Sequence, residues 1–197
     1  MSTPIDFYLD FVSSFGYLAR GRLLQIARKY GRPVVYRPVD IARIRIAAGN
    51  TGPPNSKIPA KMKYLTTDFL RWADYYGLKM VSRLSGWDTG VLNRGLYLAI
   101  ERDQADAYVE HAWNCVWRDG LDPGAASTHA ELETRMGWSS GELAPFANSP
   151  EVEARYAAEI EAASSRGVFG VPTFITDDQL WWGNDRLDFL ERYLASN

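Results

Sequence analysis

The stretch that decides the fold is Val168-Phe169-Gly170-Val171-Pro172-Thr173, near the end of the chain. Its glycine and proline predict a bend between a helix that stops at Gly167 and a strand that begins at Thr173. A second stretch, Asp10-Phe11-Val12-Ser13-Ser14-Phe15-Gly16-Tyr17, predicts a strand that runs into a helix with a serine at the junction. We expect the fold to bring the serine junction and the proline bend together.

The residues around the first junction predict a βαβ unit. Residues 5–12 form a mostly apolar run that Asp10 interrupts, as in a buried strand. Ser13 or Ser14 can cap the following helix, which Gly31 would stop, and residues 33–39 read as a second strand. A strand, a helix and a strand in this order predict a right-handed crossover.

The middle of the chain reads as helical. After a turn-rich segment at residues 47–59, helical spacing or composition predicts helices at 62–76, 90–103, 105–119, 128–136 and 140–147, and a further helix from Pro150, capped by Ser149. A hairpin of strands 173–176 and 179–182, and a helix that opens at Asp185, complete the chain. We therefore predict an α/β domain of residues 1–50 and 165–197, divided by an all-helical insertion domain of residues 51–164.

Charge is distributed unevenly along the 197 residues. Residues 1–63 hold 11 Lys/Arg against 3 Asp/Glu, a balance of +8, whereas residues 64–197 hold 11 against 21, a balance of −10. The basic third favours either a small anionic ligand or an ordinary solvated face. Because the basic residues are dispersed and the pI is near 5.7, we expect no nucleic-acid partner.

The cysteine and histidine content limits the chemistry. Cys115 is the only cysteine, which excludes an internal disulfide and fits a reducing compartment. His111, His129 and Cys115 lack the spacing of metal ligands, so we expect no metal. The sequence shows neither a signal peptide nor an apolar run of membrane-spanning length, and we expect a cytoplasmic protein with no membrane partner.

Four blocks carry a resemblance to a known family. They are residues 10–19, Pro53-Pro54-Asn55, residues 168–173 and residues 181–187. In this order they resemble the signatures of 2-hydroxychromene-2-carboxylate isomerases, glutathione-dependent relatives of the kappa-class glutathione transferases with a thioredoxin-like fold. The chain departs from the usual family pattern at Ser14, which replaces a proline, and at Gly16, which replaces a common serine.

The resemblance implies a set of site residues. Ser13 would be the catalytic residue and would donate a hydrogen bond to the sulfur of bound glutathione, while Asn93 would contact the organic substrate, a small aromatic carboxylate. The residues implied to bind the glutathione cofactor are Asn55, Lys61, Val171, Pro172, Trp182, Asn184 and Asp185. The resemblance also makes a cis bond before Pro172 the better expectation, and implies a homodimer.

Several readings of Ser13 remain open from the sequence. A lone serine before a helix is most often only a cap. A serine-hydrolase nucleophile is disfavoured because the Gly-x-Ser-x-Gly elbow is absent. The family resemblance predicts a glutathione-dependent isomerase of naphthalene-type aromatic catabolism. The alternatives are a kappa-like glutathione transferase or peroxidase, and a non-catalytic thioredoxin-fold binding protein.

Overall fold

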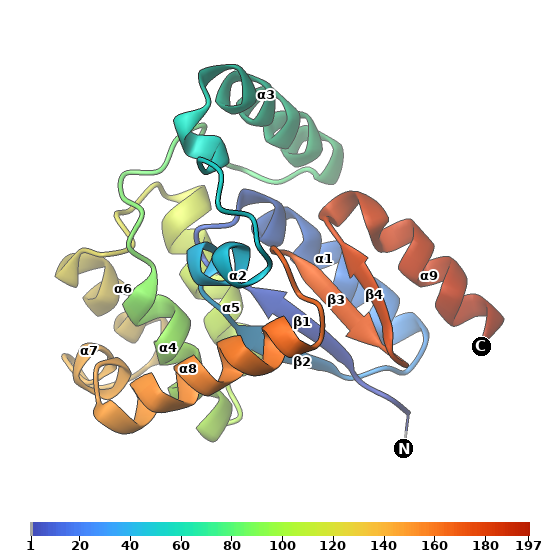
Figure 1. The fold of residues 1–197 in the computed structure, drawn as a ribbon. Helices are drawn as coiled ribbons and strands as arrows, with labels where there is room; N and C mark the ends of the chain where they lie inside the picture. Colours follow the sequence, from blue (N-terminus) through green and yellow to red (C-terminus); the bar gives the residue numbers. More distant parts are fainter. Residues whose placement is uncertain (1) are drawn as a thin grey trace.

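The computed structural model describes residues 2–197, which form a four-stranded mixed sheet surrounded by helices (Figure 1). The strands are β1 (Ile5–Leu9), β2 (Val34–Pro38), β3 (Thr173–Thr176) and β4 (Gln179–Trp182), in the spatial order β2-β1-β3-β4. β1 is parallel to β2 and antiparallel to β3, and β3 is antiparallel to β4. The predicted α/β fold class is confirmed.

The first helices differ slightly from the prediction. α1 (Ser14–Lys29) connects β1 to β2 as expected, and Ser13 is its N-cap. The sequence reading missed α2 (Ile41–Ala47), which begins where the side chain of Asp40 accepts hydrogen bonds from the amides of Ala42 and Arg43. A short 3₁₀ helix, Asn55–Lys57, then leads into α3 (Pro59–Tyr76).

The remaining helices follow the predicted order. They are α4 (Gly90–Glu101), α5 (Ala105–Trp113) with its π-helical continuation Asn114–Arg118, α6 (Ala126–Met136), α7 (Leu143–Ala147) and α8 (Pro150–Ser165). After the hairpin, a 3₁₀ turn at Asn184–Arg186 precedes α9 (Leu187–Ser196), so the last helix begins two residues later than predicted. No helix within residues 2–197 combines the length and the apolar character needed to cross a membrane.

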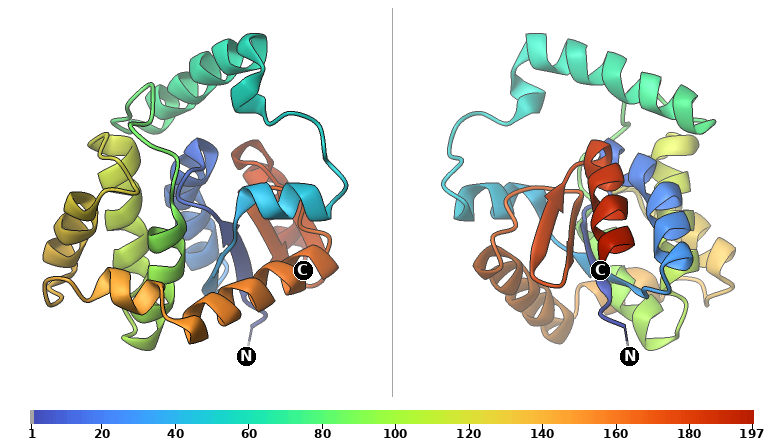
Figure 2. Two further views of the ribbon diagram at one scale, coloured as in Figure 1. Left: turned by 60° about the vertical axis from the view of Figure 1, so that its left-hand side comes forward. Right: turned by 90° about the vertical axis from the view of Figure 1, so that its right-hand side faces the viewer.

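The two faces of the sheet carry different helices (Figures 1 and 2). Alternation along β1 directs Phe7 into a core that includes residues of α1 and α9, and Tyr8 into a second core with residues of α8. Both side chains are buried. The sheet is thus covered on both sides, so functional groups can reach a ligand only at the ends of its strands.

An aromatic cluster joins the sheet to the helices between β2 and β3. The ring centroid of Trp113 on α5 lies 5.8 Å from that of Phe7 and 5.3 Å from that of Phe11, and Phe11 also packs edge-on against Tyr108. One apolar core therefore continues from the sheet into the helical segment. The predicted boundary between residues 164 and 165 falls at the last residues of α8.

Candidate active site

The site is built at one end of the sheet. The antiparallel register pairs Tyr8 of β1 with Thr173 of β3, so the chain leaves β1 towards Ser13 next to the point where it enters β3 from Pro172. Segments 160 residues apart in the sequence therefore meet at this end. The predicted meeting of the serine junction and the proline bend is confirmed.

Ser13 lies at the N-terminus of α1 and is 8% exposed. Its Oγ accepts a hydrogen bond from the Gly16 amide at 3.0 Å, and within the described part of the chain its hydroxyl hydrogen has no acceptor. The amides of Ser14 and Phe15 also have no acceptor among residues 2–197. The free hydroxyl proton and the free first-turn amides can stabilise a negative charge placed beside Ser13.

Gly16 fits closely against the aromatic cluster. A Cβ at this position would lie 2.8 Å from Cζ2 of Trp113 and 3.4 Å from Oγ of Ser13. A serine here, as in the usual family pattern, would require Trp113 to move. The departure at Gly16 is therefore explained by the packing of Trp113 in this chain.

The proline loop presents an open backbone edge. The Val171–Pro172 peptide bond is cis, as predicted. The Gly183 amide donates to the Pro172 carbonyl at 2.9 Å, whereas the N–H and C=O groups of Val171 form no hydrogen bond within residues 2–197. Such an edge can pair with an extended peptide in the manner of an added strand.

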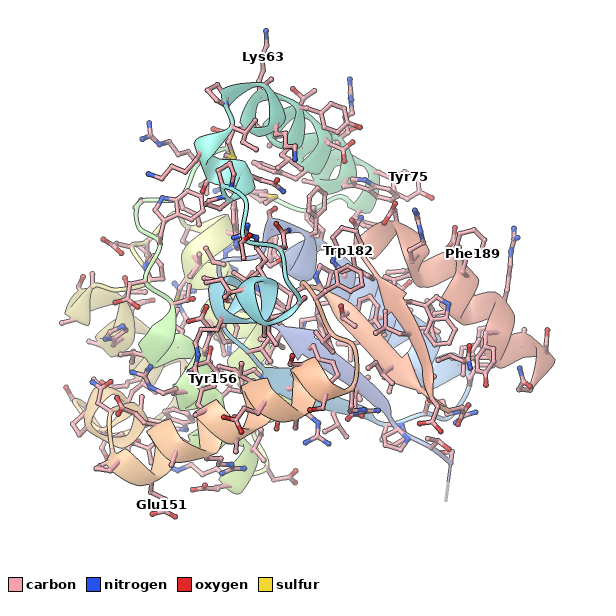
Figure 3. All side chains as sticks on the ribbon, viewed as in Figure 1. Lys63, Tyr75, Glu151, Tyr156, Trp182 and Phe189 are labelled. Atoms are coloured by element: carbon pink, nitrogen blue, oxygen red, sulfur yellow. The ribbon has the colours of Figure 1, made fainter. Side chains whose placement is uncertain are left out.

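Trp182 forms a wall beside this loop (Figure 3). Trp182 is 51% exposed, its indole packs edge-on against Phe169, and its Nε1 lies 2.9 Å from where a Cβ of Gly170 would lie. Gly170 therefore allows the indole to cover the loop. The exposed face of the indole is available to a ligand held along Val171.

Asn184 and Asp185 follow Trp182 in the 3₁₀ turn. Asn184 is buried, and its Nδ2 atom has no hydrogen-bond partner among the described residues. Burial raises the pKa of Tyr76, which lies near Asn184 at the end of α3. Asp185 does not cap the last helix as predicted, because its carboxylate is paired with Arg186 at 2.5 Å and α9 begins at Leu187.

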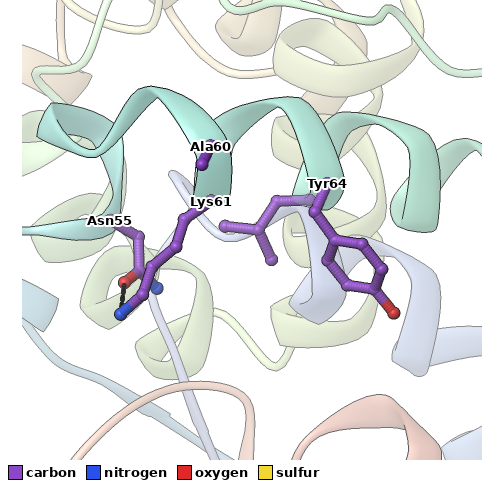
Figure 4. A pocket seen from close by; sticks show the side chains of 5 residues that line it. Asn55, Ala60, Lys61 and Tyr64 are labelled. Carbon is purple, nitrogen blue, oxygen red and sulfur yellow. Dashed lines mark hydrogen bonds between the residues drawn. The ribbon is translucent and has the colours of Figure 1, made fainter.

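Asn55 lies on the 3₁₀ helix before α3, and Lys61 lies on α3 itself. They point towards each other, with Nζ of Lys61 3.4 Å from Oδ1 of Asn55, and line an open pocket of about 430 Å³ together with Ala60, Tyr64 and Leu65 (Figure 4). Neither Ser13 nor Val171 lines this pocket. The predicted glutathione-binding residues therefore form two separate groups in the structure. One group, Asn55 and Lys61, lies at this pocket, and the other lies around the proline loop.

α3 spans the space between these two groups. It contacts α1, and Figure 2 shows it lying across the N-terminal end of that helix. The Tyr17 hydroxyl donates to the Lys79 carbonyl at 2.9 Å and ties α1 to the segment after α3. α3 therefore forms an arm over the serine junction.

Asn93, the residue predicted to contact the substrate, lies on α4 beside the turn that precedes Ser13. It is 2% exposed, its Oδ1 accepts from the Phe11 amide at 3.1 Å, and its Nδ2 donates to Oδ1 of Asp10 at 3.0 Å. It also donates to the Tyr156 hydroxyl. In this arrangement the amide supports the turn before Ser13, and its contact with a substrate stays a prediction.

Sequence reasoning missed the role of Asp10. This carboxyl is 3% exposed and accepts hydrogen bonds from four donors: the amides of Val12 and Ile41, the Thr89 hydroxyl, and the Asn93 side chain. Burial raises the pKa of Asp10, and these hydrogen bonds oppose that shift. The available signal was a charged residue inside an otherwise apolar run.

Cys115 and the histidines lie outside this site. Cys115 is fully buried, and burial raises the pKa of its thiol to about 11. His129 contacts the Pro123 carbonyl through Nε2. Within the described residues, no three His, Cys, Asp or Glu side chains are grouped as metal ligands would be.

Comparison with known proteins supplies the family. Residues 4–195 match the model of the DSBA-like thioredoxin domain. The chain is 41% identical over 187 residues to 2-hydroxychromene-2-carboxylate isomerase of Pseudomonas putida, covering 95% of this chain and 92% of that protein. It is 39% identical over 198 residues to the protein of that name from Sphingobium xenophagum, covering 98% and 99%.

Solved structures agree with this grouping. A structure of 2-hydroxychromene-2-carboxylate isomerase matches with a TM-score of 0.91 at 40% identity, covering 98% of this chain and 94% of that one. A probable DsbA oxidoreductase from Streptomyces coelicolor, 18% identical with a TM-score of 0.78 and coverage of 98% and 89%, shares the fold. The chain therefore belongs to the 2-hydroxychromene-2-carboxylate isomerase family, within the DSBA-like thioredoxin domains.

Proposed function

We propose that this chain is a glutathione-dependent isomerase that interconverts 2-hydroxychromene-2-carboxylate and trans-o-hydroxybenzylidenepyruvate in naphthalene-type aromatic catabolism. The observation that carries the proposal is the Ser13 hydroxyl, whose proton is free, at a helix N-terminus beside the open backbone edge of Val171. Relatives about 40% identical over nearly the whole chain bear the name of this enzyme.

The residues at the site suit glutathione. The unpaired N–H and C=O groups of Val171 match the peptide backbone of the tripeptide. The orphaned Nδ2 of buried Asn184 calls for an acceptor such as a ligand carboxylate or carbonyl. Lys61 supplies a cation for the second carboxylate from the arm, and Asp185 can accept from the ammonium group.

Glutathione would supply a thiol sulfur that adds to the conjugated substrate, making a double bond rotatable, and is then eliminated unchanged. The chain's part is to favour the charged sulfur. The Ser13 hydroxyl, whose proton has no acceptor among the described residues, would donate a hydrogen bond to it, and the free amides of Ser14 and Phe15 would add the positive end of the helix dipole. With these groups, no basic side chain near Ser13 is needed to stabilise the charged sulfur.

The absence of a cysteine at this junction separates the proposed chemistry from dithiol exchange. Ser13 occupies the helix start, and Cys115, the only cysteine, is buried in the core. The thiol must therefore come from a ligand. We further propose that the chain acts in the cytoplasm as a homodimer on a small aromatic carboxylate.

The experiment is product analysis with purified protein and 2-hydroxychromene-2-carboxylate. We expect formation of the open-chain isomer with glutathione, quantitative recovery of free glutathione, and no turnover with S-methylglutathione, which cannot ionise. Accumulation of a glutathione conjugate or disulfide would favour the transferase or peroxidase alternative. Turnover without any thiol would contradict the proposal.

Ser13→Ala tests the assigned role directly. We expect turnover to fall at least about 10-fold, because one lost donor to developing charge costs up to roughly 2.7–4 kcal/mol, while calorimetry still detects glutathione binding. Ser14→Ala, at the adjacent serine, is the matched control and should retain turnover within a few-fold. Near wild-type turnover of Ser13→Ala would remove Ser13 from the mechanism.

A further inference from the structure

The turn that carries Ser13 is held by Asp10, at its start, and by two side chains of the helical segment. The Phe11 amide donates to Oδ1 of Asn93, the Val12 amide to Oδ1 of Asp10, and the Ser13 amide to the Asp10 carbonyl at 2.9 Å. The Phe11 carbonyl accepts from Nε1 of Trp117 at 3.1 Å. Every amide between Asp10 and the start of α1 is therefore paired, which fixes the direction in which the turn enters the helix.

We propose that Asp10 is a positioning residue for the reaction, which acts through Ser13 by locking the turn that presents its hydroxyl. The proposal rests on the proposed function for its activity measurements. Asp10 contributes to the turn twice, through its carbonyl to the Ser13 amide and through its side chain to the Val12 amide. The side chains of Asn93 and Trp117 bond to the backbone of the turn only at Phe11, at its amide and its carbonyl respectively.

The carboxyl group is suited to this task because it accepts on both oxygens. Oδ1 accepts from Val12, Thr89 and Asn93, and Oδ2 accepts from the Ile41 amide at 3.0 Å. An asparagine has no acceptor on its nitrogen, so either the Val12 amide or the Ile41 amide would lose its partner. Asp10 therefore ties the Ser13 turn to the start of α2.

The same carboxyl connects the turn to the helical segment. Thr89 precedes α4 and donates to Asp10 at 2.6 Å, while Asn93 on α4 bonds to both Asp10 and Tyr156 of α8. The position of Ser13 is therefore determined by α4 and α8 as well as by β1.

Asp10→Asn is the test, with Glu133→Gln as its matched control. Glu133 is also 3% exposed and accepts from two backbone amides, those of Gly141 and Leu143, each at 2.7 Å, but it serves the start of α7. Both variants change a buried carboxyl to an amide and should lower stability. We expect Asp10→Asn to lower kcat at least 10-fold with substrate KM changed less than 3-fold, and Glu133→Gln to keep kcat within 2-fold.

A double-mutant cycle with Ser13→Ala identifies the route of the effect. If Asp10 acts through Ser13, adding Ser13→Ala to Asp10→Asn should lower kcat less than 3-fold further. Hydrogen exchange of the 11–17 backbone gives a measurement that does not need activity: exchange should quicken in Asp10→Asn and not in Glu133→Gln. If the wild type converts no chromene substrate, the proposed function fails, and hydrogen exchange still tests the positioning.

Thr89→Val provides a second variant if Asp10→Asn does not fold, because it removes one Asp10 hydrogen bond with little change of shape. We expect a smaller loss of kcat, again not additive with Ser13→Ala. The proposal would be overturned by an Asp10→Asn variant that keeps kcat like Glu133→Gln, by full additivity with Ser13→Ala, or by unchanged exchange at residues 11–17.

Discussion

The serine junction and the α3 arm differ in how deeply their residues are buried. At the junction, Asp10, Phe11 and Ser13 are buried and the turn amides are all paired. Along the 18 residues of α3, only Phe69 and Ala73 are buried. The comparison indicates that the reacting centre is fixed by the core, whereas Asn55 and Lys61 belong to a more loosely packed element suited to binding.

The largest expected difference between the two regions is in stability. Phe11→Ala should reduce the free energy of unfolding by about 3–5 kcal/mol, because it opens a cavity between Tyr108 and Trp113. Phe69→Ala, on the arm against Trp117, should cost less than half as much, since α3 can rearrange locally. Urea unfolding measures both, and equal losses would show that the arm is part of the cooperative core.

A smaller effect is expected at the cationic end of the arm. Lys61→Ala should weaken glutathione binding about 10-fold, equivalent to roughly 1.4 kcal/mol, with kcat changed only a few-fold. Lys63→Ala is the control, because Lys63 is exposed and points away from the molecule (Figure 3). Calorimetric titration of the two variants would contradict the assignment if Lys63→Ala weakened binding as much as Lys61→Ala.

The smallest effect on activity is expected at Cys115. Burial raises its pKa to about 11, so the thiol stays neutral and unreactive at neutral pH. Cys115→Ser should keep turnover within a few-fold and lower stability, because it buries a hydroxyl where a thiol packs. Alkylation should be slow in the native protein and fast after unfolding; rapid native alkylation with loss of activity would contradict this.

Local chemistry made much of the fold predictable. Ser13, Ser149 and the hairpin across Asp177-Asp178 were identified from capping and turn residues, and both aspartates adopt positive φ angles in the structure. The end of β1 was predicted too late, because Asp10 starts a turn after Leu9. The helix expected at 105–119 becomes π-helical at Asn114, a change with no clear signal in the sequence.

The candidate site was less predictable than the fold. The cis bond before Pro172 followed from the family resemblance, and the structure agrees with it. The environment of Asn93 depends on Asp10 and Tyr156, which are far from it in the sequence, so no local pattern could reveal that its amide is fully engaged. The functional roles of all the predicted site residues stay predictions.

The ionisation of bound glutathione tests the central claim most directly. Lowering a thiol pKa from ~8.5 to about 6.5 takes ~2.7 kcal/mol. A helix N-terminus supplies roughly 0.3–1 kcal/mol, up to ~2 when partly buried, and a hydrogen bond to a charged group adds ~1.5–3 kcal/mol. The groups around Ser13 are therefore sufficient.

The measurement is a pH titration of thiolate absorbance in the ultraviolet for glutathione bound to the wild type and to Ser13→Ala. We predict that bound glutathione is mostly thiolate at neutral pH in the wild type, and that Ser13→Ala shifts the apparent pKa back towards the free value. A bound thiol that titrates no lower than free glutathione would contradict thiolate activation by Ser13 and favour a non-catalytic binding protein.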